Sequence, residues 1–158
     1  MPIMFSSGDF HMIIGIAVTN AMHEVLEKCY EELQKEIQMD VYDAYSPESY
    51  SRTEGLLDSW KREWSRLSTE LRFEPSLLPI APTRWQHGSL YDDGTGKGYT
   101  DVRDVLIDII AGGYRAYNAH TGRPIGGRPF WDKYVAKVNA NLDNWMKSAL
   151  AHQGLAVI

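Results

Sequence analysis

The chain has 158 residues, of which 44% are hydrophobic and 23% are charged. This length and composition are typical of one folded domain and exclude a disordered or low-complexity chain. The formal net charge is −5, from 16 basic and 21 acidic residues. A protein that grips nucleic-acid phosphates needs clustered lysine and arginine, so this charge disfavours DNA binding as the main task.

The single cysteine indicates a protein made in a reducing cytoplasm, and the most apolar run is too short for a membrane span. Cys29 lies in a helical apolar pattern, which indicates a small buried side chain rather than a nucleophile. The run Met12–Val18 is far shorter than the roughly 20 residues of a membrane span, and no basic segment precedes it. We therefore expect neither membrane insertion nor secretion.

An apolar stripe predicts a long N-terminal helix over Ile14–Gln38. The stripe consists of Val18, Met22, Val25, Cys29, Leu33 and Ile37, and Glu24/Lys28 and Glu31/Lys35 stand at i,i+4 spacing. Pairs of this kind support a helix. The stripe indicates a face packed in the core, although a groove for a partner helix would show the same pattern.

The segments that follow this helix read as loop and strand. Asp40–Gly55 combines turn formers and tyrosines without any period, so it predicts an ordered loop whose tyrosines are either packed internally or part of an interface. Leu56–Phe73 fits either a helix or two strands, but the alternation in Leu71–Glu74 favours a β-hairpin. Three prolines between Pro75 and Pro82 then predict extended chain.

A glycine-rich stretch, Asp92–Gly98, has the composition of a phosphate-binding loop but not its pattern. Tyr91 stands where that loop needs its first glycine, and Gly98 stands where it needs serine or threonine. The stretch therefore predicts a hairpin tip or connector.

Two more helices are expected in the second half of the chain. Asp101–Gly113 opens with acidic residues and closes with glycines, which is the polarity of a short capped helix. A third helix is predicted to end near Gly154. Its apolar positions are Trp131, Tyr134, Val138, Leu142, Trp145 and Leu150. The expected fold class is α+β: one domain with a long N-terminal helix, a small antiparallel sheet, a short central helix and a C-terminal helix.

The chemistry-bearing residues form no recognisable active site. The five histidines are far apart in sequence and lack the spacings of metal ligands. No Gly-x-Ser-x-Gly elbow is present, and the cysteine has no catalytic histidine context. The sequence therefore predicts no catalytic residue, no metal and no cofactor, so a structural or binding role is favoured over an enzyme.

Two stretches resemble the neck and tail-completion proteins of long-tailed bacteriophages. The first runs Tyr45-Ser46-Pro47-Glu48-Ser49-Tyr50-Ser51-Arg52-Thr53-Glu54-Gly55-Leu56-Leu57-Asp58-Ser59-Trp60, and the second is Gly127-Arg128-Pro129-Phe130-Trp131 before the last helix. His87-Gly88-Ser89 and the helix at 101–113 are similar to members from phages of Gram-positive hosts. The resemblance implies a long N-terminal helix, a tyrosine-rich loop, a small sheet and an Arg-Pro-Phe turn, and it favours strands over Leu56–Phe73.

One position departs from the family pattern. Glu54 stands where the family commonly has the first of two glycines. A turn that needs a positive φ at this position would be strained, because a side chain disfavours that conformation. Gly55 would then be the freer hinge.

The resemblance implies assembly. We expect a single neck or tail-completion domain over 1–158, with 1–12 and 152–158 flexible or ordered only by an interface. Several copies, six or twelve, would form a ring that contacts the connector or head-closure protein on one side and the tail terminator or tube proteins on the other. DNA would only pass through the lumen, where an acidic wall would not hold it. The place of action would be the virion neck or tail, after assembly in the host cytoplasm.

Two loops are the candidate assembly patches, because they concentrate the residue types that anchor interfaces. Their candidate interface residues are Tyr45, Pro47, Tyr50, Arg52, Thr53, Leu56, Arg128, Pro129, Phe130 and Trp131. If they are anchors, Arg52→Ala and Phe130→Ala should weaken assembly more than folding; if both loops pack on their own domain, stability should fall instead. The alternative functions are a tail terminator or minor capsid protein of the same virion, or a small regulator or enzyme outside the virion.

Overall fold

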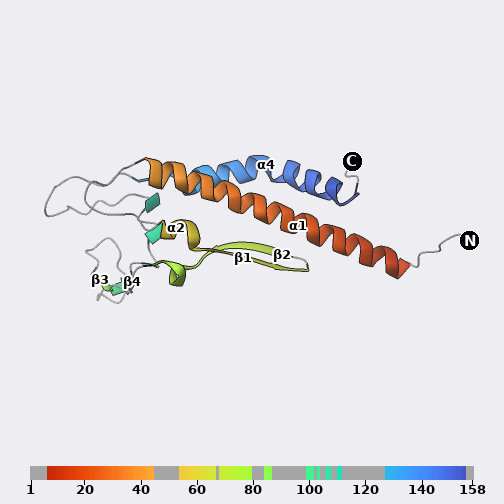
Figure 1. Ribbon diagram of the computed structural model, residues 1–158, viewed down its shortest axis with the longest axis horizontal. Coiled ribbons are helices and arrows are strands. Elements are labelled where there is room, and N and C mark those ends of the chain that lie inside the picture. Colours follow the sequence, from red (N-terminus) through yellow and green to blue (C-terminus); the bar gives the residue numbers. More distant parts are fainter. Residues whose placement is uncertain are drawn as a thin grey trace, which may run out of the picture. The chain divides into compact units, whose positions relative to one another are not determined.

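The computed structural model describes residues 7–44, 54–66, 68–79, 84–86, 99–101, 103, 106–107, 110–111 and 127–155. Its elements in chain order are α1 (Ser7–Ile37), the π-helix η1 (Gln38–Asp43), α2 (Gly55–Asp58), β1 (Trp60–Ser65), β2 (Ser68–Phe73), the 3-10 helix η2 (Pro75–Leu77), β3 (Arg84–Gln86), β4 (Tyr99–Asp101) and α4 (Phe130–His152). Figure 1 shows the two long helices and the small sheets. The expected α+β fold class is confirmed.

The residues divide between two compact units. Unit 1 contains 1–34, 61–72 and 134–158, and unit 2 contains 35–60 and 73–133. The expectation of one domain over 1–158 stays a prediction.

In unit 1, α1 packs antiparallel against α4 (Figure 1). Their buried contact is built on Ala21, Val25 and Ala149. Cys29, Trp145, Met146 and Leu150 pack around these three residues. Alanine at two of the central positions allows the helices to approach closely, and the larger side chains fill the margins. The predicted apolar stripe is therefore a core face over this part of α1.

The hairpin of β1 and β2 covers a different face of α1. Only two residues separate the strands, so they pair as an antiparallel hairpin. Of the segment Leu56–Phe73, which fitted either a helix or two strands, residues 60–65 and 68–73 are strands, and residues 56–58 belong to the short helix α2. The Thr19 hydroxyl donates to the Arg66 carbonyl oxygen over 2.9 Å. The rings of His23 and Trp64 lie 4.4 Å apart, and the Arg62 guanidinium lies over the Tyr30 ring. The hairpin thus follows α1 from Tyr30 to Thr19.

The start of α1 differs from the sequence prediction, whereas the end of α4 agrees with it. Helix α1 begins at Ser7, seven residues before the predicted start, so part of the expected terminal segment 1–12 is helical. Helix α4 ends as predicted: Gly154 has φ 79°, its N–H donates to Ala151, and the Leu155 N–H donates to Leu150. This is the Schellman motif, which favours glycine at the left-handed position.

In unit 2, the structure contradicts the first part of the loop predicted over Asp40–Gly55. Residues 40–43 continue from α1 as the π-helix η1 rather than forming irregular chain. Its carbonyl groups are satisfied from a distant segment, since the Arg128 guanidinium donates to the oxygen atoms of Asp40 (3.4 Å) and Val41 (2.6 Å). A contact from a distant part of the chain left no periodic signal in the local sequence.

Two further boundaries in unit 2 also differ from the prediction. The chain after Phe73 forms the 3-10 turn η2, with Pro75 at its start, before any extended segment. Asp101 was expected to open a helix but is the last residue of β4, where it pairs with Arg84. The short central helix is present at its described residues, Arg103, Leu106, Ile107, Ile110 and Ala111. The glycine-rich stretch 92–98, predicted to be a hairpin tip or connector, lies outside the described residues.

Candidate functional site

The predicted assembly residues fall into three groups. Tyr45, Pro47, Tyr50, Arg52 and Thr53 lie outside the described residues. Leu56 and Phe130 are buried, with exposed fractions of 4% and 0%. Arg128, Pro129 and Trp131 are at least partly accessible. The Arg-Pro-Phe turn is therefore divided: its phenylalanine contributes to the subunit's own core, and its proline faces outward.

The turn 127–131 is held in unit 2 by several independent contacts. The Arg128 N–H donates to the Ile110 carbonyl oxygen over 2.8 Å, in addition to the side-chain bonds to η1. Trp131 stacks on Trp60 with ring centres 5.6 Å apart and an interplanar angle of 13°. Phe73 meets the Trp60 ring at 5.4 Å. The turn is thus preorganised, which lowers the entropy that a partner must offset on binding.

Glu54 adopts the conformation that the sequence indicated as strained. Its φ is 53° and its ψ is 13°, in the left-handed region, and Glu54 is the non-glycine residue with positive φ among the described residues. The Glu54 carbonyl oxygen accepts the N–H of Leu57, which starts the short helix α2. Gly55, expected as the freer hinge, is instead the buried first residue of α2.

An apolar surface at the start of α1 was not singled out by sequence analysis. Met12, Ile13 and Ile16 are 55%, 49% and 55% exposed. The hairpin turn meets α1 at Thr19, and the end of α4 meets it at Asn20, whose amide donates to Gln153. Figure 1 shows α1 extending past both. The signal lies in the run Met12–Val18, which the sequence analysis weighed only as a membrane span. This run is apolar on every face of a helix, whereas a surface helix buries only one face, so part of the run must be exposed.

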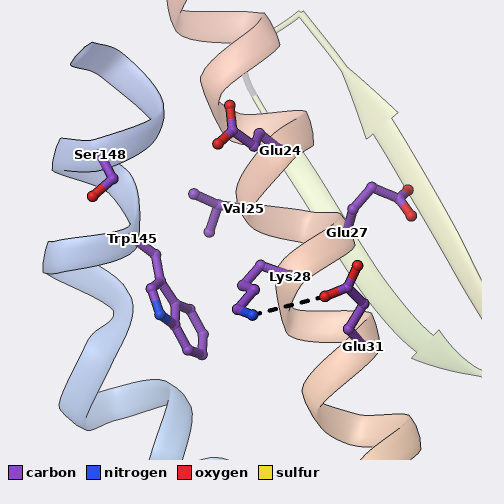
Figure 2. Close-up of a pocket in the computed structure, with 7 residues that line it drawn as sticks. All are labelled: Glu24, Val25, Glu27, Lys28, Glu31, Trp145 and Ser148. Atoms are coloured by element: carbon purple, nitrogen blue, oxygen red, sulfur yellow. Dashed lines mark ion pairs between the residues drawn. The ribbon is translucent and has the colours of Figure 1, made fainter. Parts of the chain in front are cut away.

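A cavity of about 430 Å³ lies between α1 and α4 in unit 1. It is lined by Glu24, Val25, Glu27, Lys28, Glu31, Trp145 and Ser148. Figure 2 shows Trp145 reaching from α4 toward α1, and the ion pair between Lys28 and Glu31 beside it. This site was also missed, because its residues come from segments more than a hundred positions apart.

The cavity's carboxylates already have partners of different kinds. Glu27 pairs with Arg62 at 2.5 Å. Lys28 lies 3.7 Å from Glu31 and 3.4 Å from Glu32, so its charge is shared. Glu24 contacts His152 at 2.7 Å, and a histidine carries charge only when it is protonated. Glu24 is therefore the lining carboxylate without a permanent cation beside it.

Cys29 and Tyr134 form a polar pair between α1 and α4. Burial raises the pKa of the Cys29 thiol, and the hydrogen bond with Tyr134 offsets part of that rise. Burial also raises the pKa of Tyr134 well above its ordinary value, with smaller contributions from the charge of Cys29 and from their hydrogen bond. Both groups are held neutral, which is the opposite of the activation that a catalytic thiol needs.

Neither a metal site nor a membrane span is found in the described part of the chain. Its histidine, cysteine and carboxylate side chains form no group of three that could hold a metal ion. None of its helices combines the length and apolar character needed to cross a bilayer.

The fold and these surfaces define a small α+β protein with accessible apolar and charged surfaces on its helices. A family model named YomN matches residues 10–152. The chain belongs to the YomN family, and the match indicates a phage-associated protein. The searches of curated proteins and of solved structures found no match to this chain.

Proposed function

We propose that this protein is a structural, non-enzymatic component of the head–tail interface, the neck, of a tailed phage virion. Copies would assemble as a ring that joins the DNA-filled head and its connector to the tail and lets DNA pass. The match to a phage-associated family supports the setting. A role in the neck is supported by the order of motifs along the chain: a tyrosine-rich loop, a hairpin and an Arg-Pro-Phe turn before the last helix.

The observation that carries the proposal is the uncovered start of α1. Met12, Ile13 and Ile16 point away from the α4-packed stripe that contains Ala21 and Val25. Burying apolar area yields about 25 cal/mol per Å², so side chains of this size favour association once a partner covers them. A contiguous apolar surface on a projecting helix is typical of an assembly contact.

A ring needs two different patches on each subunit, because head-to-tail contacts join unlike surfaces. The start of α1 supplies one candidate patch. The accessible side of the turn 127–131, with Pro129 exposed, supplies a second that is already rigid. The net charge of −5 is compatible with a lumen that does not retain DNA.

Electron microscopy of lysates from a phage with a nonsense mutation in this gene tests the proposal. The expected result is DNA-filled heads beside separate, finished tails. Heads without DNA or tails of irregular length would favour the minor capsid or tail-terminator alternative. Intact, infectious virions of normal appearance would exclude a neck role and favour a regulator or enzyme outside the virion.

A further inference from the structure

We infer that the cavity between α1 and α4 is a docking site for an arginine side chain of a partner protein. The inference rests on the geometry of unit 1 and does not depend on the neck role. Three features carry it: an accessible indole, a surplus of negative charge and an apolar floor. The first two match the guanidinium group of an arginine, and the third matches its aliphatic stem.

The indole comes from α4. Trp145 packs on the Ala21–Val25–Ala149 core, yet it also lines the cavity, so part of its ring is accessible from outside. Figure 2 shows the ring in the space between the two helices. A planar guanidinium stacks on an indole face more favourably than on any other aromatic side chain.

The negative charge comes from one face of α1. Glu24, Glu27 and Glu31 all line the cavity, against Lys28 as the lining cation. Arg62 pairs with Glu27, and Lys28 lies near both Glu31 and Glu32. Glu32 also pairs with Lys137 at 2.6 Å. One more permanent cation beside Glu24 would balance the group. A partner arginine would supply it in competition with the contact between Glu24 and His152.

The floor accounts for the choice of a long side chain over a small ion. Val25 and the ring of Trp145 are the apolar residues that line the cavity. Figure 2 shows both in the space between α1 and α4. The aliphatic stem of an arginine buries against the apolar surface of Val25 while its guanidinium stacks on the indole beside the carboxylates. A compact hydrated cation would leave this apolar surface uncovered, so a peptide side chain fits the whole site better.

Nuclear magnetic resonance on the isotope-labelled full chain tests the inference. The probe is the peptide acetyl-Gly-Arg-Gly-amide, and its matched control replaces arginine by citrulline, which has the same shape without the charge. The Trp145 indole N–H resonance is assigned by its loss in Trp145→Phe. We expect a saturable shift of this resonance with the arginine peptide and none with the citrulline peptide.

Variants of the protein complete the test. Glu24→Gln should weaken the binding of the arginine peptide by about threefold, which is the effect of losing one exposed ion pair. Glu70→Gln, which removes an exposed carboxylate on β2 outside the cavity, should leave binding unchanged. Equal shifts from both peptides, or no saturable shift, would overturn the inference. A Trp145 shift that depends on protein concentration alone would identify a second copy as the occupant and also overturn it.

Discussion

The Arg128 guanidinium donates a hydrogen bond of 2.6 Å to the carbonyl oxygen of Val41, which lies 87 positions earlier in the chain. This bond joins the Arg-Pro-Phe turn to the π-helix that ends the long N-terminal helix. It is partly buried, and a second, longer bond reaches Asp40. The arginine of the turn therefore has a structural partner in its own unit, whatever else it contacts in an assembly.

Arg128→Ala should destabilise the isolated subunit by about 1.5–3 kcal/mol, because hydrogen bonds to a charged group contribute that much. Arg128→Lys should recover part of the loss, since an ammonium can reach one carbonyl oxygen but cannot fork between two. Urea denaturation measures both. Arg72→Ala is the matched control: its ion pair with Glu63 is exposed, so its loss should cost less than about 1 kcal/mol.

Glu54→Gly should stabilise the protein by about 1 kcal/mol, since the left-handed conformation costs a non-glycine residue roughly 1–2 kcal/mol and glycine's greater unfolded-state entropy offsets part of the gain. Glu54→Ala keeps the Cβ atom and serves as the control, with little change expected. Thermal unfolding of the three proteins measures the effect. A loss of stability in Glu54→Gly would mean that the Glu54 side chain contributes more than its backbone strain costs.

The sequence was most informative where local periodicity and punctuation decide the structure. The spacing of α4 and Gly154 gave the last helix and its end, and the alternation before Glu74 gave the hairpin. The sequence did not predict the π-helix η1, because Arg128 contacts that segment from a distant part of the chain. It did not distinguish a core Phe130 from an interface anchor, since aromatic residues are enriched in both settings. Nor could it bring Glu24 and Trp145 to one cavity.

Phe130→Ala should destabilise the isolated subunit by about 3–5 kcal/mol, because its side chain is 0% exposed and its removal leaves a cavity. Pro129→Ala changes the exposed neighbour and should leave the thermal unfolding temperature nearly unchanged. Complementation of a nonsense phage by each variant then separates folding from assembly. Failure of the well-folded Pro129→Ala protein to complement would place an assembly contact at this turn.

The Cys29–Tyr134 pair should make stability fall at alkaline pH. Burial raises the pKa of both groups above their ordinary values of 9.0 and 10.0, so the unfolded chain releases these protons at lower pH than the folded chain. Their contribution is complete below pH 9.0 and is lost as pH rises beyond the ordinary values. Tyr134→Phe should therefore lose less stability than the unmodified protein between neutral and alkaline pH. Thermal unfolding temperatures measured across that pH range test this expectation. An equal fall of the unfolding temperature in the two proteins would contradict it.

Replacing Ile13 and Ile16 together by glutamine should abolish assembly while leaving the subunit folded. Both side chains are about half exposed in the isolated chain, so their loss removes little core packing, whereas a covering partner would lose their apolar contact. Sedimentation of the purified protein and its incorporation into particles measure assembly, and circular dichroism measures folding. Leu142→Gln on α4, where the leucine is 40% exposed, is the control for lost apolar surface elsewhere. If the double variant assembles as well as Leu142→Gln, the start of α1 is not an assembly contact.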